Sequence, residues 1–151
     1  MAEATAWIMN LDGGLRTAVG EREMMHLVDN PVFADIPQTP LHCQQVLLWE
    51  GEILPVIDLM AWMTGQPSER TQACVGIVGW QDQPGASPQY GALLFTGIPE
   101  KVRVRDEQVC DLPERPSGWE IVAISCFSHN GQPIPILDVS LLFSETLVTR
   151  R

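Results

Sequence analysis

The sequence predicts a mainly β protein made of two similar small barrels, with short helices only as connectors. Apolar runs of about five residues, each followed by a turn signal, are typical of a small barrel or sandwich. The pattern G-x-x-[IL]-P-[IV]-[IL]-D-[LV] occurs twice, at Gly51–Leu59 and Gly131–Val139, with an offset of 80 residues. The 151 residues are enough for one hydrophobic core without disulfide or metal support.

The chain is expected to open with a hairpin. The run Thr5–Leu11 is apolar with β-branched and aromatic content, and Leu15–Val19 reads as the returning strand. Asp12-Gly13-Gly14 between them favours a tight turn, because glycine accepts a positive φ.

The next two segments carry weaker signals. Glu21–Val28 is expected to form a short helix or irregular turn with Met24, Met25 and Leu27 pointing inward. Three prolines in Asp29–Pro40 exclude a long helix or a central strand there.

A second hairpin is expected around Glu50-Gly51, with strands Val46–Trp49 and Glu52–Ile57. Pro55 lacks an amide hydrogen, so its strand is expected to lie at an edge or a bulge at that point.

A short helix over Leu59–Thr64 follows. The Asp58 carboxylate can accept from the free N–H groups of the first helical turn, and Gly65 suits the C-terminal stop.

The second half of the chain shows a similar succession of short strands, turns and an Asp-capped helical turn. Its expected strands are Val75–Trp80, Tyr90–Thr96, Lys101–Arg105, Ile121–Phe127 and Gln132–Leu137. Its expected loops are Gln81–Gln89, Asp111–Gly118 and the turn at His129-Asn130-Gly131. Asp138 is expected to cap a last helical turn over Val139–Phe143.

The two matching units indicate a duplication that leaves a groove between two barrels, a natural docking site. We expect a first barrel at about residues 15–70 and a second at about 71–145, the latter with a possible contribution from strand 5–11. Coincidental similarity of two hairpins is the alternative.

The charge disfavours two classes of partner. Nine Lys and Arg against nineteen Asp and Glu give a formal net charge of −10. An acidic surface repels nucleic-acid phosphates and anionic membranes. We see no secretory signal and no apolar run long enough to span a bilayer, so we expect a cytoplasmic protein without membrane insertion.

No catalytic or metal site is predicted, and no cofactor. The four cysteines form no C-x-x-C pair, and the three histidines are not spaced as zinc ligands. The cysteines are expected to be reduced thiols. His42 and Cys43 are adjacent, so on a strand they would point to opposite faces rather than form a reactive pair.

Three stretches resemble the CheW-like family of chemosensory coupling proteins. Leu48–Leu59 resembles the family signature N-L-R-G-x-x-x-P-[IV]-[IV]-D-L, Ile36–Pro40 resembles its I-P-x-x-P linker, and Gly91–Pro99 occupies the place of a second-barrel strand. The resemblance covers about Thr5 to Phe143. It implies a fold of two SH3-like five-stranded β-barrels, no catalysis and no cofactor.

The resemblance also implies a scaffold that links the regulatory domain of a CheA-like histidine kinase to the cytoplasmic tips of methyl-accepting chemoreceptors. An accessory coupling protein of a twitching-motility (type IV pilus) pathway and a small-molecule sensor are the alternatives. The partner-binding residues are expected on the first barrel; they are Met24, His26, Gln45, Val46, Trp49 and Glu50.

The chain departs from the family pattern at the proposed binding face. The signature Asn and Arg fall on Leu48 and Glu50, and His26 stands where the family often has Glu. One hypothesis is a pair of reversed polarity between His26 and Glu50, which would weaken as the histidine loses its proton. The alternative is that the two side chains are exposed and independent.

Overall fold

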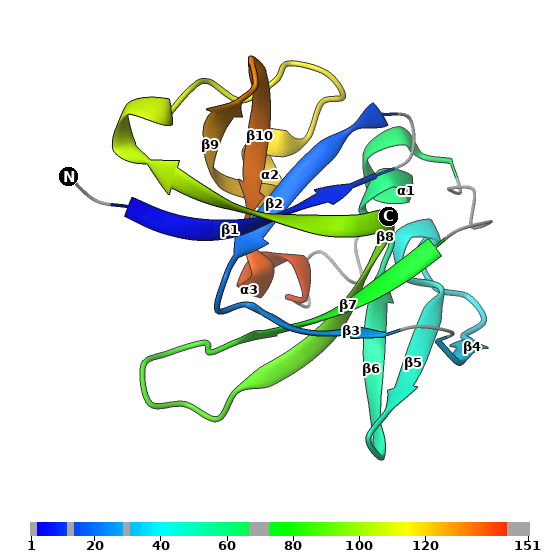
Figure 1. The fold of residues 1–151 in the computed structure, drawn as a ribbon. Coiled ribbons are helices and arrows are strands. Elements are labelled where there is room, and N and C mark those ends of the chain that lie inside the picture. Colours follow the sequence, from blue (N-terminus) through cyan, green and yellow to red (C-terminus); the bar gives the residue numbers. More distant parts are fainter. Residues whose placement is uncertain (1–2, 12–13, 29–30, 67–72, 145–151) are drawn as a thin grey trace.

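The structure is a computed structural model that describes residues 3–11, 14–28, 31–66 and 73–144. Two residues of the expected first turn, Asp12 and Gly13, lie outside the described residues. So do Asp29 and Asn30 at the start of the proline-containing segment. The mainly β fold class is confirmed (Figure 1).

One sheet of ten strands contains every strand assigned in the described part of the chain. The strands are β1 (Glu3–Asn10), β2 (Arg16–Gly20), β3 (Met24–Val28), β4 (Phe33–Asp35), β5 (Gln45–Trp49), β6 (Glu52–Ile57), β7 (Ala73–Trp80), β8 (Gln89–Arg105), β9 (Ala123–His129) and β10 (Gln132–Leu137). The helices are α1 (Leu59–Thr64), α2 (Trp119–Val122), α3 (Val139–Leu142) and the 3-10 turns η2 (Leu41–Cys43) and η3 (Asp106–Gln108).

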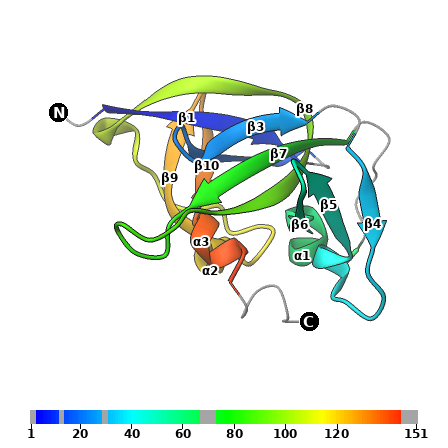
Figure 2. The same ribbon diagram turned by 90° about the horizontal axis from the view of Figure 1, so that it is seen from below.

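The sheet wraps into two halves that share β8. The strand order is β4-β5-β6-β8-β1-β2-β10-β9, and β7 joins β3 to β8. The first part of β8 pairs with β7 and β6, whereas its last part pairs with β1. The lower half in Figure 1 therefore holds β3 to β7, and the upper half holds β1, β2, β9 and β10. Figure 2 shows β3, β7 and β8 side by side from below.

The strand pairing crosses the boundaries expected from the sequence for the two barrels. β2 falls within the segment 15–70 but pairs with β1 and β10. β7 falls within 71–145 but pairs with β3. Each half of the sheet thus takes strands from both expected segments.

The expectation of a helix or irregular turn over Glu21–Val28 holds only for the turn at residues 21–23, because Met24–Val28 form strand β3. Met25 and Leu27 are 52% and 43% exposed, whereas only Met24 packs against the core. Glu, Met and Leu favour a helix locally, but pairing with β7 overrides that propensity.

Two further expectations need correction. The strands expected at Tyr90–Thr96 and Lys101–Arg105 form the single strand β8, in which Gly97 has a φ of +74°. The expected strand at Ile121–Phe127 begins only at Ala123, because Trp119–Val122 form the helical turn α2.

The duplicated motif has the same local structure in both copies. Asp58 Oδ1 accepts from Ala61 N at 3.1 Å, and Asp138 Oδ1 accepts from Leu141 N at 3.2 Å. The Asp58 and Asp138 N–H groups each donate at 2.8 Å, to His42 O and Val122 O respectively. These acceptors are again 80 residues apart, so the repeat extends beyond the nine matching residues.

The two prolines of the motif take equivalent places. Pro55 faces Val46 and Pro135 faces Cys126 in antiparallel pairs, and each is followed by a residue in a parallel pair. The strand therefore gains its second neighbour only after the residue that lacks an amide hydrogen.

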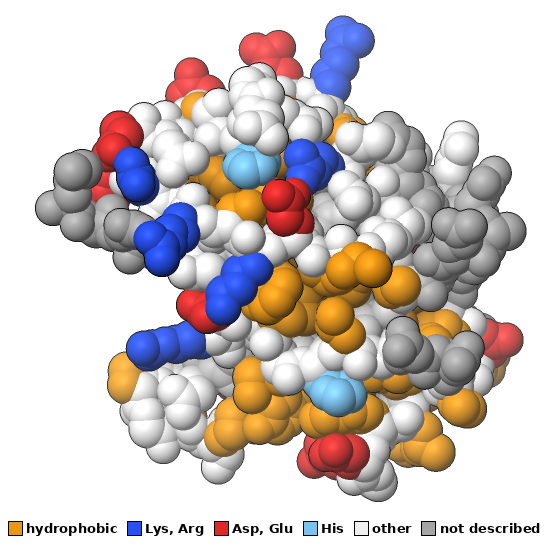
Figure 3. Space-filling model, viewed as in Figure 1, with side chains coloured by type: hydrophobic (Ala, Val, Ile, Leu, Met, Phe, Trp, Pro, Cys, Tyr) orange, Lys and Arg blue, Asp and Glu red, His pale blue; other side chains and the backbone are white. Residues whose placement is uncertain are grey.

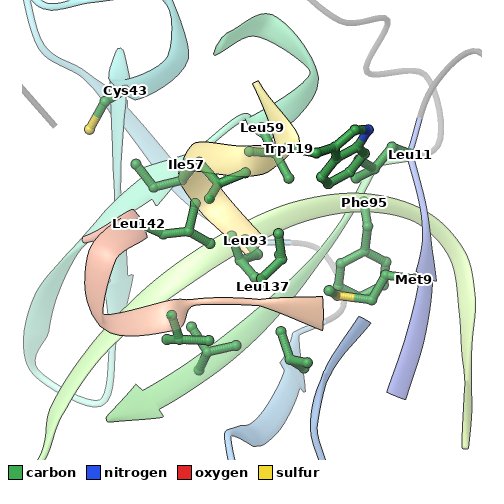
Figure 4. Close-up of a cluster of buried hydrophobic side chains, with 14 residues drawn as sticks. Met9, Leu11, Cys43, Ile57, Leu59, Leu93, Phe95, Trp119, Leu137 and Leu142 are labelled. Atoms are coloured by element: carbon green, nitrogen blue, oxygen red, sulfur yellow. The ribbon is translucent and has the colours of Figure 1, made fainter. Parts of the chain in front are cut away.

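The largest core cluster joins the two halves. Figure 4 shows Trp119 lying beside Leu11 and Phe95, with Leu93 and Leu137 in the same cluster. A second cluster around Leu47 and Ile77 fills the lower half, and a third around Phe127 and Ile134 fills the upper half.

Candidate functional site

An apolar surface covers the outer side of the β5–β6 hairpin. Side chains alternate across a strand, so Leu47 and Leu54 face the core while their neighbours face out. Leu48 and Ile53 form a direct cross-strand pair and are 62% and 67% exposed. The outward residues of β5 and β6 and of the adjoining segment through β4 form what we call the hairpin face: Val32, Ala34, Val46, Leu48, Ile53 and Pro55.

The end of the hairpin meets β3 at an aromatic rim. The Trp49 ring centroid lies 6.1 Å from those of His26 and Tyr90. Glu50 and Gly51 make the turn with φ values of +47° and +78°, a conformation that suits a two-residue hairpin. Glu50 and Glu52 are exposed and give the tip of the hairpin an acidic character.

The structure places the six predicted binding residues on two neighbouring elements. Gln45, Val46, Trp49 and Glu50 lie on β5 and its turn, and His26 on β3 reaches them through its contact with Trp49. Gln45 Nε2 donates to Asp35 Oδ1 at 2.9 Å.

Met24 differs from the other five residues. It packs against the largest core cluster and over Gly76, where its sulfur would lie 2.8 Å from an added Cβ.

The sequence reasoning missed Leu48 and Ile53. A two-residue turn at Glu50-Gly51 sets Trp49 opposite Glu52 and Leu48 opposite Ile53. Because Leu47 and Leu54 are the inward pair, this register already indicates that the next pair points to solvent. The signal was available in the hairpin itself.

The hypothetical pair between His26 and Glu50 is not formed. Among the residues that the structure describes, no ion pair joins them, and the His26 ring lies against Trp49 instead.

The hydrophobic side chains on the face seen in Figure 3 gather around β3 and between β3 and β1. Exposed Met25 and Leu27 belong to this strand, next to a small hollow that Trp7 also lines. Exposed apolar side chains therefore also lie on β3, the strand that carries His26.

A groove of about 520 Å³ lies between the two halves of the molecule, and its use as a docking site stays a prediction. Met25 and Trp80 line it from the lower half, and Ile124 and Val139 line it from the upper half.

The Glu23 carboxyl group also lines this groove, and its Oε1 accepts from Gly20 N at 3.0 Å. Burial raises the pKa of Glu23; the Gly20 hydrogen bond opposes this and the Asp138 charge adds to it.

This pKa shift predicts a pH dependence that the Glu23→Gln substitution removes. A carboxyl group whose pKa is raised on folding binds its proton more tightly in the folded state. Its contribution to stability therefore falls as pH rises from the ordinary value of 4.5 through the folded value, and is constant above it. The wild-type free energy of unfolding minus that of Glu23→Gln should decline over this window in urea titrations. A difference that is flat or rises with pH contradicts the prediction.

His42 and Cys43 do not form the strand assumed from the sequence. They lie in the 3-10 turn η2, and both are buried. Burial raises the pKa of the Cys43 thiol, which lowers its thiolate fraction and its reactivity.

In the described ranges, no helix combines the length and apolar character that crossing a bilayer requires.

Comparison with known proteins gives a consistent family match. The family model described as "CheW-like domain" matches residues 19–147. A solved structure, the scaffolding protein TtCheW from Thermoanaerobacter tengcongensis, superposes with a TM-score of 0.74 at 16% identity, covering 95% of each chain. No curated protein matches the chain. Because the family model spans most of the sequence and the fold agrees, this chain belongs to the CheW-like domain family.

Proposed function

We propose that this protein is a non-catalytic scaffold that couples chemoreceptor tips to the regulatory domain of a CheA-like histidine kinase. Family membership supports a coupling role, and the relative that it superposes on is itself described as a scaffolding protein. The observation that carries the proposal is the exposed cross-strand pair Leu48 and Ile53 at the centre of the hairpin face.

Exposing an apolar pair of this kind to water is unfavourable in free energy, and binding of a partner removes that cost. A sheet that faces water on one side ordinarily places polar residues there. Contiguous exposed apolar residues mark protein interaction sites, and burying them on association is favourable. Val32, which is 66% exposed, extends the patch because its carbonyl accepts from Leu48 N at 3.3 Å.

The rim beside the hairpin face supplies the polar part of the interface. His26 and the partly buried Trp49 adjoin it, and aromatic residues are enriched among interface anchors. Glu50 and Glu52 at the tip favour a partner that brings Lys or Arg to the edge of the contact. Gln45 and Val46 extend the proposed contact along β5, and Met24 at the start of β3 completes the proposed set of binding residues. We expect micromolar affinity, about −8 kcal/mol.

The test is a calorimetric titration of the full chain with a CheA-like kinase regulatory domain, and separately with a receptor tip, from the same genome. Replacing Leu48 or Ile53 by glutamate should weaken binding to at least one of them by about tenfold or more. Both side chains are exposed, so the variants should keep the wild-type circular dichroism spectrum.

Ile98→Glu is the matched control, since Ile98 is 87% exposed but lies on β8 outside the hairpin face. It should bind within about twofold of wild type. Failure of the wild-type chain to bind either partner, or full binding by Leu48→Glu and Ile53→Glu, contradicts the proposal. Binding only to partners encoded with type IV pilus genes would assign the scaffold to that pathway.

A further inference from the structure

Two cysteines that are distant in sequence face each other in the upper half of the molecule. Cys110 Sγ donates to Cys126 Sγ at 3.4 Å, and Cys110 N donates to Cys126 O at 3.0 Å. The neighbouring residues Val109 and Phe127 form an antiparallel bridge. Cys110 and Cys126 are therefore directly opposed across two antiparallel segments.

This placement suits a disulfide without movement of the backbone. Directly opposed residues in antiparallel strands have Cα atoms about 4.5–5.5 Å apart. That spacing falls within the range of about 4.4–6.8 Å found for disulfides, whose S–S bond is about 2.05 Å long. Small rotations of the two side chains can close the remaining gap.

The two thiols differ in access to solvent. Cys110 is half-buried, whereas Cys126 is only 2% exposed. Burial, followed by the hydrogen bond from Cys110 and its charge, raises the pKa of Cys126 to about 12. Cys110 is therefore the sulfur that an oxidant meets first. Oxidation of Cys110 also removes its thiol, and with it two of the causes that raise the pKa of Cys126.

We propose that Cys110 and Cys126 are a redox-active pair that a hydroperoxide converts reversibly into an intramolecular disulfide. The Cys110 thiolate attacks the peroxide, the O–O bond breaks, and a sulfenic acid forms as hydroxide or alkoxide leaves. Cys126 then attacks the Cys110 sulfur, forming the S–S bond and releasing water. The two thiols are oxidised by two electrons, the peroxide is reduced, and a dithiol reductant reverses the reaction by exchange.

The disulfide would join the segment after β8 covalently to strand β9 in the upper half. β9 ends the strand path of the sheet, and the segment after β8 meets it at the bridge between Val109 and Phe127 and at the Cys110 N–Cys126 O hydrogen bond. Gln108 Nε2 adds a third contact by donating to Ser128 O at 3.1 Å. The disulfide would close a loop that contains α2 and the buried Trp119. Closing a loop of this size constrains the unfolded chain and stabilises the fold.

The experiment treats the fully reduced chain with hydrogen peroxide and measures intact mass and non-reduced peptide maps. We expect a loss of two hydrogen atoms, a peptide pair linked through Cys110 and Cys126, and full reversal by dithiothreitol. The melting temperature of the oxidised chain should rise by about 5–10 °C. A chain carrying both Cys43→Ala and Cys74→Ala should behave identically, because it retains the opposed pair.

Cys110→Ser should lose both the crosslink and the thermal shift, and Cys126→Ala provides a second variant with the same expectation. The proposal is overturned if peroxide leaves all four thiols titratable. It is also overturned if the crosslink involves Cys43 or Cys74, joins two molecules, or is replaced by sulfinic acid on Cys110. The readouts require no kinase or receptor, so they are independent of the proposed scaffold function.

Discussion

Replacing Trp119 by alanine is expected to lower the free energy of unfolding by about 3–5 kcal/mol. The side chain is 1% exposed and belongs to the cluster that joins both halves of the sheet (Figure 4). Alanine would leave a large cavity among residues that α2, β1 and β8 hold in place, and such a cavity cannot collapse fully. Urea unfolding followed by circular dichroism measures the loss.

Phenylalanine at the same position separates the ring from its N–H group. Trp119 Nε1 is buried and has no hydrogen-bond partner among the described residues, which costs about 1–3 kcal/mol. Trp119→Phe removes that donor and keeps most of the apolar volume, so it should cost far less than Trp119→Ala. Ile98→Ala, at an 87% exposed site, should change stability by less than about 0.5 kcal/mol. Equal losses in all three variants would refute the assignment of Trp119 to the core.

Gly91→Ala is expected to cost about 1–3 kcal/mol through overpacking. A methyl group there would lie 2.7 Å from Phe143 Cζ and closer still to Cε1. The ring has little room to retreat, because it stacks on Trp80 with centroids 4.9 Å apart. The substitution therefore tests whether the residue that follows α3 is packed against β8.

The double variant Gly91→Ala with Phe143→Ala gives the matched comparison. If the ring is the obstacle, Gly91→Ala should cost little in the background that lacks it, so the two effects will not add. Thermal and urea unfolding of the four chains provide the cycle. Additive losses within about 0.5 kcal/mol would show that Gly91 and Phe143 are not coupled.

The parts of the fold predicted well are those in which local chemistry and tertiary structure agree. The helix Leu59–Thr64 begins after Asp58 and ends at Gly65 as expected, because the cap and the stop residue act within one turn. The repeat placed an equivalent cap at Asp138.

The parts predicted poorly depend on distant partners. Strand β3 exists because β7 lies beside it, and nothing in its own sequence alternates clearly. Gly97-Ile98-Pro99 resembles a break between strands, yet these three residues stand opposite Met9 alone as an irregularity in the pairing with β1, and β8 continues past them. Whether such a segment ends a strand or forms a bulge depends on the partner strand and cannot be inferred from the segment alone.

The candidate site stays a prediction: the sequence places it beside the Glu50-Gly51 turn and does not single out the exposed pair Leu48 and Ile53. Trp49 adjoins the turn and Glu50 takes the place of the signature Arg, and the structure places both at the end of the β5–β6 hairpin. Leu48 and Ile53 were not chosen, because an apolar residue in a strand is ordinarily assigned to the core. The register of the hairpin determines which side chains face solvent, and it places Leu48 and Ile53 on the solvent side.

The shared strand β8 has a consequence for how the molecule can be cut. Gln89–Arg105 supplies a backbone ladder to both halves, and β2 and β7 each pair with strands from the other side of the chain. A fragment that stops near residue 70 would keep β3 without β7 and β2 without β10. Neither half is therefore a separable module, and loss of either piece by truncation, proteolysis or gene fission would leave the other with unsatisfied edges rather than a smaller working protein.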